Sequence, residues 1–558
     1  MSNNTMSPVQ RFWALIKPDQ KEIQNVYLYA LFSGLVNLSL PIGIQAIVNL
    51  IQGGQISTSW IVLVSFVILG ILAAGIMQVQ QLKITEILQQ KIFARASLEF
   101  AYRMPRIKLE ALYRHYAPEL MNRFFDVISV QKGLSKMLID FSTASIQTLF
   151  GLLLLSMYHP FFIVFSLILI VLAYTIFRLT AKKGLKTSLE ESKHKYEVAH
   201  WLEEIARTAT SFKLAGITDL PMKGADERTE HYIRARESHF KVLVTQYWLM
   251  IVFKILVAAG LLIVGGLLVF DQQMNVGQFV AAEIIILLVL NSVEKLILSF
   301  ETVYDVLSSL EKLGQVSDLE LEQNVGMETS SLDEAGAMSV ELKNIDFSYP
   351  DAPEAVFKNC SLNIEAGKRV LIRGNGGKGK SSLLYLLSGL FTPQKGSILY
   401  NDIPAGNLIP DQLRSRIGDC LTEEQLFEGS ILDNITMGRP NAKLDRVKWV
   451  VEKLGLKDFI SSLPNGYQSI IRNQGKLLSG GIADKLILAR SIVDQPKLLL
   501  IKDQFTSLKG KEREDIMRFL FDRENNWTLV IVSHDPQVEK LVDMIVEVSD
   551  QQLIISKK

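Results

Sequence analysis

The sequence has little of several features that define small secreted or nucleic-acid-binding proteins. Two cysteines in 558 residues, Cys360 and Cys420, argue against a disulfide framework or a thiolate metal cluster. The 59 Lys and Arg residues are balanced by 58 Asp and Glu residues, so a net charge of +1 gives no case for a nucleic-acid partner. The N-terminal stretch also lacks the apolar core of a cleaved signal, and we expect no targeting segment there.

Long stretches of the first half contain no charged residue. Charges are missing from residues 23–82 and from residues 141–177, and a third apolar region covers residues 242–300. Because about 20 apolar residues suffice for a helix to cross a bilayer, each region has room for two helices joined by a turn. We therefore predict an all-α, six-helix transmembrane domain in the lipid bilayer over residues 1–325, with spans near 26–51, 60–82, 140–157, 160–180, 247–270 and 276–298.

The distribution of basic residues predicts the orientation of these spans. Ten Lys and Arg residues lie between positions 83 and 139, whereas the turns at 53–59, 158–160 and 271–276 have none. Basic loops remain on the cytoplasmic side of a membrane. The sequence therefore predicts a multi-pass protein of the plasma (inner) membrane with both termini in the cytoplasm.

A few polar residues fall inside the predicted spans. A carboxylate within a membrane is a functional candidate by default, and Glu283 is such a residue near an outer turn. The alternative is an interfacial or water-facing position in a bundle with an aqueous cavity. Lys254, Glu294 and Lys295 lie near the inner boundary, where snorkelling of their side chains accounts for the charges.

The pattern of apolar residues changes after an acidic linker at residues 326–337. Over residues 338–558, short β-type runs alternate with helical segments, which favours an α/β domain with a mostly parallel sheet. The stretch GNGGKGKS at 374–381 matches the phosphate-binding pattern G-x-x-x-x-G-K-[ST], with an apolar strand before it and an amphipathic helix after it. Its glycines let backbone N–H groups converge on phosphate oxygens, so we predict a nucleotide site.

Three further segments make the chain resemble the ATP-binding cassette (ABC) exporters, in particular a half-transporter of the bacterial type I secretion and peptide-export group. They are LLSGGIADKLILARSI at 477–492, TLVIVSHDP at 528–536 and FSYP at 347–350. The resemblance implies an α/β P-loop ATP-binding cassette in the cytoplasm, with ATP and Mg²⁺ as cofactors. It also implies a dimer with a second half-transporter, in which each ATP lies between one phosphate loop and the other subunit's signature.

The resemblance also assigns roles to individual positions. Tyr349 would stack on adenine, and His534 would be the catalytic switch histidine. Ser381 would ligate Mg²⁺, and Lys380 would reach the β- and γ-phosphates. The positions implied to bind nucleotide are Tyr349, Gly374, Asn375, Gly376, Gly377, Lys378, Gly379, Lys380, Ser381, Ser382 and, for the partner's ATP, Ser479, Gly480 and Gly481.

Several positions depart from the family's pattern. Lys502 stands where the family has the Asp that supports Mg²⁺, and Asp503 stands in place of the catalytic Glu. Opposite unit charges 4 Å apart attract by about 4 kcal/mol at an effective dielectric near 20, so this exchange weakens Mg²⁺ binding. The Asp503 side chain is one methylene shorter than Glu, which takes a catalytic base out of reach of the attacking water. Further replacements are Thr422 in the Q-loop, Ile482 in the signature and Lys509 in the D-loop.

These departures affect one half of the expected dimer. The altered positions Lys502, Asp503 and Thr422 would serve this chain's own ATP, whereas the largely preserved Ser479, Gly480 and Gly481 would serve the ATP of the partner. We therefore expect impaired hydrolysis at the chain's own site and a heterodimer in preference to a homodimer. The family would place coupling helices near 107–125 and 203–220, and candidate further partners are a membrane-fusion protein and an outer-membrane channel. The alternative function is an ATP-binding pseudo-ATPase that acts as a membrane sensor.

Overall fold

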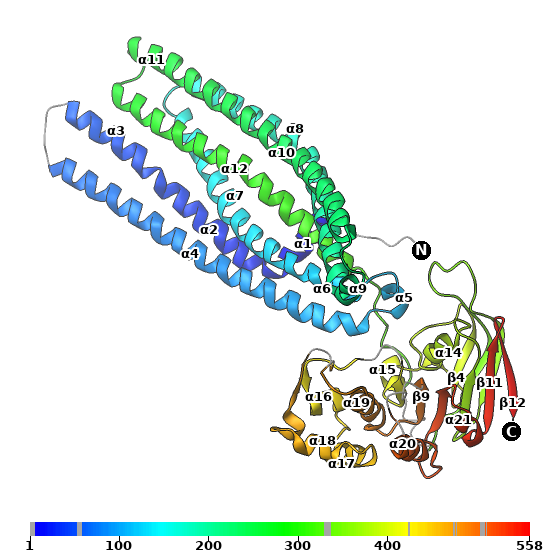
Figure 1. Ribbon diagram of the computed structural model, residues 1–558. Coiled ribbons are helices and arrows are strands. Elements are labelled where there is room, and N and C mark those ends of the chain that lie inside the picture. The colour runs from blue at the N-terminus through cyan, green and yellow to red at the C-terminus, as the bar shows by residue number, and fades with distance from the viewer. Residues whose placement is uncertain are drawn as a thin grey trace. The chain divides into compact units, whose positions relative to one another are not determined.

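The computed structural model describes residues 6–52, 58–328, 336–421, 425–472, 475, 477–502, 508 and 510–557. The chain divides into two units, which can be followed by colour in Figure 1. The first unit contains residues 1–105 and 115–319, and the second contains residues 106–114 and 320–558.

The first unit consists of helices, since a helix satisfies its backbone hydrogen bonds internally and can therefore lie in lipid. Among the described residues, six helical stretches are long and apolar enough to cross a membrane, which confirms the predicted all-α membrane fold. The helices are α1 (Pro8–Ile16), α2 (Gln20–Asn37), α3 (Ser39–Gln52), α4 (Thr58–Arg103), α6 (Ala117–Asn122), α7 (Asp126–Ser156), α8 (Phe161–Arg207), α9 (Ala209–Leu214), α10 (Leu220–Gly260), α11 (Gly266–Phe270) and α12 (Val276–Ser317).

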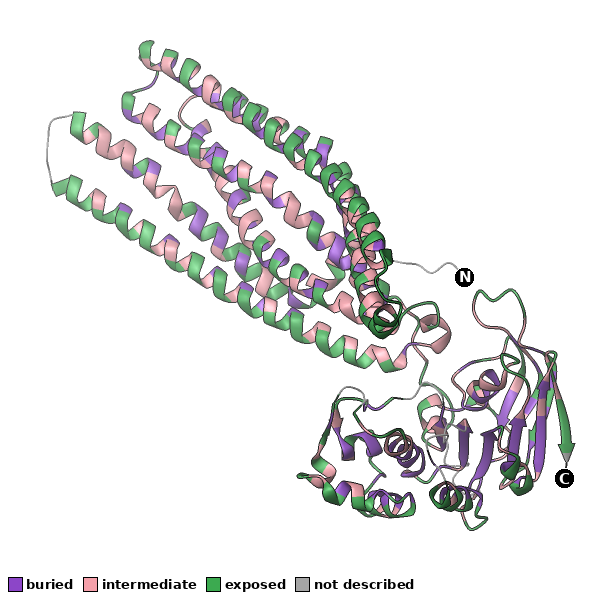
Figure 2. Cartoon of the chain, viewed as in Figure 1, coloured by how far each residue is buried: buried purple, intermediate pink, exposed green. Residues whose placement is uncertain are grey.

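Five of these helices, α4, α7, α8, α10 and α12, are longer than a bilayer requires. Helix α8 has 47 residues, which corresponds to about 70 Å at 1.5 Å per residue and is more than twice the thickness of the hydrocarbon core. Apolar side chains such as Phe66, Ile68 and Leu69 on α4 are exposed in the isolated unit. Figure 2 shows exposed positions along the outer helices, as expected for surfaces that face lipid.

Two predicted spans are interrupted. The span predicted at 26–51 consists of α2 and α3, which are separated at Leu38. Pro41 explains the break, because proline has no N–H to donate to the carbonyl of the residue four positions earlier. The span predicted at 247–270 contains a π-helical turn at Leu261–Gly265 between α10 and α11.

Helices α7 and α12 approach closely because small residues lie between them. A Cβ added at Gly133 would lie 2.3 Å from Val306 Cγ2, and one at Gly151 would lie 2.8 Å from Val289 Cγ2. Lys254 and Glu294 form an ion pair of 2.6 Å between α10 and α12, so these two charges pair across helices where we expected snorkelling. Glu283 is exposed on α12.

The second unit contains the predicted α/β fold. Its main sheet has six strands in the order β12-β11-β3-β10-β9-β6, and a second sheet has the order β2-β1-β4-β5. In the main sheet β3, β6, β9, β10 and β11 are parallel, and β12 is antiparallel to β11. The strands are β1 (Val340–Phe347), β2 (Phe357–Ile364), β3 (Arg369–Arg373), β4 (Lys395–Tyr400), β5 (Ile403–Pro404), β6 (Ile417–Cys420), β7 (Gly429–Ser430), β8 (Ile470–Ile471), β9 (Leu498–Lys502), β10 (Thr528–Val532), β11 (Met544–Ser549) and β12 (Gln552–Lys557).

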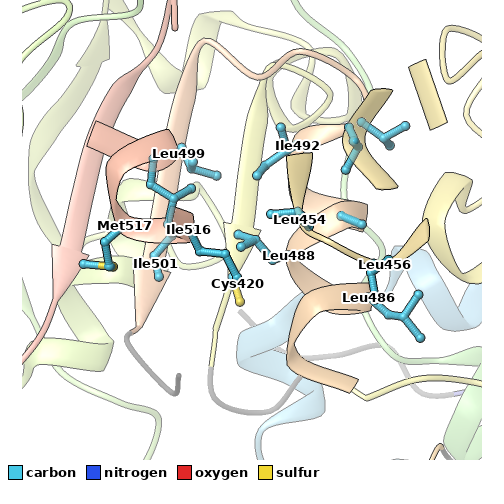
Figure 3. Close-up of a cluster of buried hydrophobic side chains, with 14 of the residues drawn as sticks. Cys420, Leu454, Leu456, Leu486, Leu488, Ile492, Leu499, Ile501, Ile516 and Met517 are labelled. Atoms are coloured by element: carbon cyan, nitrogen blue, oxygen red, sulfur yellow. The ribbon is translucent and has the colours of Figure 1, made fainter. Parts of the chain in front are cut away.

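Helices cover the main sheet and complete two apolar cores. One core joins Leu499 and Ile501 of β9 to side chains of the helices around it, including Leu486, Leu488 and Ile492 (Figure 3). The other core packs the two sheets together through buried residues such as Phe347, Phe357 and Tyr400. The helices are α14 (Lys380–Leu387), α15 (Pro410–Arg414), α16 (Ile431–Thr436), α17 (Leu444–Lys453), α18 (Lys457–Ser462), α19 (Gly480–Ile492), α20 (Lys511–Phe521) and α21 (Pro536–Leu541).

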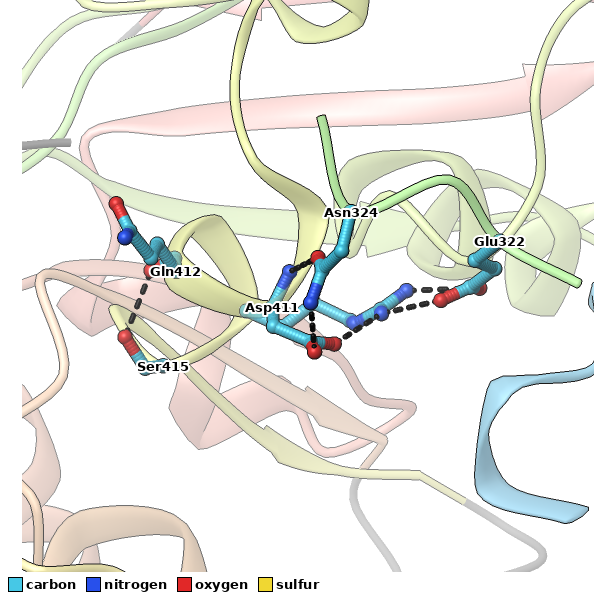
Figure 4. A network of polar contacts seen from close by, with 6 residues as sticks. Glu322, Asn324, Asp411, Gln412 and Ser415 are labelled. Atoms are coloured by element: carbon cyan, nitrogen blue, oxygen red, sulfur yellow. Dashed lines mark hydrogen bonds and ion pairs between the residues drawn. The ribbon is translucent and has the colours of Figure 1, made fainter. Parts of the chain in front are cut away.

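Two chain segments outside the predicted cassette also belong to the second unit. Residues 106–114 contain the short helix α5 (Leu109–Leu112) and pair with residues 320–322 through an Ile107–Leu321 bridge. Arg414 of α15 donates to both carboxylate oxygens of Glu322, and Asn324 contacts Asp411 (Figure 4). The Met327 N–H donates to the Asn407 carbonyl at 2.6 Å, so the start of the predicted linker at 326–337 is bonded to the cassette. Residues 329–335 of that linker lie outside the described residues.

Candidate nucleotide site

The parallel strands bring the predicted phosphate loop and Lys502, the last residue of β9, to one edge of the main sheet. Val532 of β10 is in register with Ile372 of β3 on one side and with Lys502 of β9 on the other. The carboxyl ends of parallel strands are where α/β sheets place their ligands. The chain that follows β3 is the loop at 374–379, so this loop and Lys502 leave the sheet at the same level.

The phosphate loop depends on glycine at three positions. Gly374, Gly377 and Gly379 have φ of +147°, +77° and +104°, a region that other residues rarely adopt. At Gly374 an added Cβ would also lie 2.4 Å from the Val548 carbonyl oxygen, and at Gly379 it would lie 2.6 Å from Val356 Cγ1. Gly379 is the N-cap of α14. The loop therefore turns its backbone toward a helix N-terminus, an arrangement that favours bound anions.

Two lysines of the loop contact nearby oxygen atoms. The Lys380 ammonium donates to the carbonyl oxygens of Gly374 at 2.7 Å and Asn375 at 2.9 Å. Lys378 forms an ion pair of 2.9 Å with Asp550 at the loop's outer side. Burial, together with the positive charge of Lys502, lowers the pKa of Lys380 below its usual range. Lys380 therefore lies over the loop, as phosphate recognition requires, while Lys378 is directed toward Asp550.

The Ser381 hydroxyl lies against an ammonium. Lys502 Nζ is 3.2 Å from Ser381 Oγ. An ammonium carries only donors, so it cannot ligate a metal ion, and it repels one. Among the described residues, the side chain that contacts the Ser381 hydroxyl is thus the cation of Lys502. The family pattern has a carboxylate at position 502, which supports Mg²⁺. Asp503, predicted as the catalytic residue, lies outside the described residues, as do Thr422 and Lys509.

Tyr349 lies beside the phosphate loop but also has a partner that the sequence did not predict. Its hydroxyl is 2.8 Å from Ser382 Oγ. Its ring stacks on Tyr113, with centroids 4.8 Å apart and an interplanar angle of 17°. In the same segment Glu110 accepts hydrogen bonds of 2.9 Å from the N–H and hydroxyl of Thr392. No local pattern identifies Tyr113, because more than two hundred residues separate it from Tyr349.

The predicted signature residues and the predicted switch histidine are exposed or half-buried. Ser479 is the N-cap of α19, and both Ser479 and Gly480 are exposed, whereas Gly481 is half-buried. Ile482, which replaces the last residue of the signature, packs partly against the cassette core. His534 is exposed two residues after β10. Exposed signature residues are available to a second subunit, and the described residues show no side-chain cap from Ser479 to its own helix.

Comparisons with known proteins cover both units. Residues 25–293 match the family described as "ABC transporter transmembrane region", and residues 357–506 match "ABC transporter". Over 291 residues the chain is 30% identical to the alpha-hemolysin translocation ATP-binding protein HlyB of Proteus vulgaris, a match that covers 52% of this chain and 41% of that protein. The leukotoxin translocation ATP-binding protein LktB of Mannheimia glucosida is also 30% identical over 291 residues, with 52% and 40% covered. The matched stretch thus spans about two fifths of these relatives.

The fold has a solved counterpart of nearly the same extent. A bacterial Atm1-family ABC exporter with ATP bound superposes with a TM-score of 0.85, at 17% identity, over 96% of this chain and 95% of that one. At this identity the likeness establishes the architecture of a membrane domain followed by a cassette.

Proposed function

This chain combines the transmembrane region and the ATP-binding domain of ABC transporters, and from that premise we propose that it is one half of a dimeric, ATP-dependent exporter. The observation that carries the proposal is the phosphate loop at the end of β3, with three glycines at positive φ and Lys380 folded over the loop. In this proposal the cassette binds ATP through residues 374–382 and Tyr349. The basic loops support a cytoplasmic location for the cassette and both termini.

The cargo we propose is a polypeptide. Support comes from the names of the relatives, which translocate a hemolysin and a leukotoxin. A membrane-fusion protein and an outer-membrane channel would then be partners, because a protein cargo must cross the whole cell envelope. The match covers less than half of each relative. Their names describe the cargo of those relatives, and a polypeptide cargo is a proposal for this chain.

We propose that the chain's own ATP site hydrolyses slowly. The support is the 3.2 Å contact of Lys502 with the Ser381 hydroxyl, together with Asp in place of Glu at position 503. An ammonium at about 4 Å repels a divalent ion by several kcal/mol at an effective dielectric near 20, which corresponds to a loss of affinity of at least about 100-fold. The residue at 503 is also too short to hold the attacking water as a general base.

A different half-transporter is the partner we propose. This chain keeps Ser479, Gly480 and Gly481, which would complete a partner's ATP site, and Ser479 and Gly480 are exposed. The second predicted coupling region, near 203–220, supports a docked partner as well. Its apolar side chains Leu214 and Ile217 are almost fully exposed, as expected of a surface that another protein covers. The working ATP site of the dimer would then join the partner's phosphate loop to this chain's signature.

ATP turnover by the purified chain tests this function. In nanodiscs the full chain alone should hydrolyse ATP slowly. A complex with a half-transporter that carries an intact Asp-Glu pair should be active, and Ser479→Ala in this chain should lower that activity at least tenfold. Lys511→Ala in this chain, a change at an exposed position of α20, should leave most of the turnover. Rapid hydrolysis by the chain alone, abolished by Asp503→Asn, would contradict the proposal.

A further inference from the structure

The end of β9 places a second ammonium at the nucleotide site. Lys502 is the last residue of β9 and is in register with Val532, whose other neighbour is Ile372, two residues before the phosphate loop. The alternation of side chains along a strand fixes which face Lys502 points to, so the location of its ammonium follows from the strand register. Nζ of Lys502 lies 3.2 Å from Ser381 Oγ.

Lys380 and Lys502 form a pair of cations around Ser381. Lys380 is adjacent to Ser381 in the chain and folds back onto the carbonyl oxygens of Gly374 and Asn375. The positive charge of Lys502 contributes to the lowered pKa of Lys380, which places the two ammonium groups within electrostatic reach of each other. Within the part of the chain that the structure describes, neither ammonium pairs with a carboxylate. Two cations held close together in this way are stabilised by an anion that contacts both.

Mg²⁺ does not fit this arrangement. Mg²⁺ takes an octahedron of oxygen ligands and is held in phosphate sites by one or two carboxylates together with phosphate oxygens. Here the Ser381 oxygen that would ligate the ion accepts a hydrogen bond from Lys502. Any ion at that oxygen would lie against the ammonium and be repelled.

We propose that the Lys502 ammonium takes the place of Mg²⁺ at this chain's own site, so that the site binds a nucleoside triphosphate as the metal-free anion. This inference rests on the proposed function, since it requires the phosphate loop to bind ATP. Lys380 and Lys502 then share the charge of the triphosphate, and the Ser381 hydroxyl is oriented by Lys502. A site of this kind holds ATP as a structural ligand between the two subunits and does not turn it over.

Binding of ATP with and without the metal tests the proposal. The full chain in nanodiscs is titrated with ATP in 5 mM EDTA and in 5 mM MgCl₂. We expect the affinity in EDTA to equal or exceed the affinity with Mg²⁺. Lys502→Asp should weaken binding in EDTA at least tenfold and make binding depend on Mg²⁺. Lys511→Asp, which makes the same change of charge at an exposed position of α20, should leave both affinities within twofold.

Three results would contradict it, and they separate the inference from the proposed function. Binding with Mg²⁺ that is lost in EDTA overturns the inference and leaves ATP binding intact. Equal loss in Lys502→Asp and Lys511→Asp also overturns the inference, because the effect would then be one of overall charge. Absence of binding in both buffers overturns the proposed function.

A separate cluster lies on the cytoplasmic extensions of α8 and α10. His194 and Glu197 are three residues apart on α8, a spacing that brings side chains to the same helix face. His231 of α10 lies beside them, with its ring centroid 5.7 Å from that of His194. The ligand atoms of these three residues all lie within 4.8 Å of one another. His194 Nδ1 is 2.8 Å from Glu197 Oε2.

The ligand set has the chemistry of a transition-metal site. Two imidazoles and one carboxylate suit Zn²⁺, which is bound at about 2.0–2.2 Å and accepts water as a fourth ligand. Glu197 and His231 line a cavity of about 480 Å³, which gives room for that water. Two cations near these ligands repel a bound metal ion. Lys193 lies 3.9 Å from Glu197, and Arg228, which packs over Trp201 at 4.5 Å, lines the same cavity. We infer that His194, Glu197 and His231 bind a zinc-like divalent ion that holds α8 against α10.

Metal content and thermal stability test this second site. The full chain is incubated with ZnSO₄ and desalted, and the retained zinc is measured by mass spectrometry. We expect about one Zn²⁺ per chain and a higher Tm with the metal. His231→Ala should lose both effects, whereas His200→Ala, a nearby histidine that contacts Glu119 at 3.2 Å, should keep them. Absence of retained zinc, or an equal loss in His200→Ala, would overturn the inference.

Discussion

At the scale of single residues, the glycines of the phosphate loop serve different purposes. Gly374 and Gly379 are required by the fold itself, because each combines a positive φ with a close neighbour. Gly376 has neither feature, and an added Cβ there would meet no atom within 4 Å. The glycines that match one sequence pattern therefore differ in purpose. Gly374 and Gly379 are needed for the backbone conformation, whereas Gly376 leaves space for a ligand.

Gly374→Ala should destabilise the nucleotide-free protein. The new methyl group would lie 2.4 Å from the Val548 carbonyl oxygen at a φ of +147°, so the loop or β11 must shift, at a cost of about 2–4 kcal/mol. Thermal unfolding of the full chain in detergent measures the change. Gly376→Ala is the matched control and should unfold at nearly the wild-type temperature. Equal stability of the two variants would contradict the reading of Gly374.

Asp543 links the stability of the cassette to pH. The Arg369 N–H donates to its carboxylate at 2.9 Å and the Arg523 guanidinium at 2.6 Å. Burial alone would raise the pKa of Asp543, but these two donors outweigh burial and hold it below its usual range. Since the pKa is lower in the folded state, the stabilisation is present above the unfolded-state pKa and is lost as the pH falls through the folded-state pKa.

Asp543→Asn should therefore cost about 1–2 kcal/mol of unfolding free energy at pH 7, and the difference from wild type should shrink as the pH falls below about 4. Denaturant unfolding of the full chain at several pH values provides the measurement. The control is Asp515→Asn on the exposed side of α20, where the Arg518 pair is 3.9 Å long; it should have little effect at any pH. A loss in Asp543→Asn that does not vary with pH would show that the carboxylate's charge is not involved.

At the scale of elements, the two charge-free runs and the apolar region at 242–300 correctly predicted the six helices that are long and apolar enough to cross a membrane among the described residues, because lipid excludes charge. The break at Leu38 was missed, although Pro41 in the middle of the first span was a usable signal. The phosphate loop could be predicted because its pattern is local. The contact of Lys502 with Ser381 could not, since it depends on the register of β9, β10 and β3 across distant parts of the chain.

The segment that follows α12 should be held to the cassette by Arg414. This guanidinium donates to both oxygens of Glu322 and to Asp411 at 3.0 Å. Glu322→Ala should cost about 1–3 kcal/mol, because Arg414 is largely buried and loses a charge-assisted pair. Hydrogen exchange at the Met327 and Ile409 amides should rise with it. Glu320→Ala removes a more exposed pair with Lys108 and should cost less than about 1 kcal/mol; equal effects would contradict this account.

At the scale of the whole molecule, the two native cysteines allow the predicted orientation to be tested directly. Cys360 and Cys420 are both buried in the cassette, so a membrane-impermeant maleimide should label the native protein weakly. Asp271→Cys in the turn before α12 should be labelled from outside intact cells. Asp226→Cys, at an exposed position in the first part of α10, should be labelled only after the cells are opened. Labelling of Asp226→Cys but not of Asp271→Cys in intact cells would show that the topology is the inverse of the one proposed.

The pairing of residues 106–114 with the cassette also has a consequence for biosynthesis. Glu110 contacts Thr392 across 282 residues of chain, and at about 5–20 residues per second the ribosome needs about 15–60 s to synthesise that interval. During this time the remaining four membrane spans must enter the bilayer, while Glu110 and Tyr113 are still without their partners. The cassette unit is thus completed by a segment made long before it, so this unit cannot reach its final structure until the whole intervening chain has been synthesised.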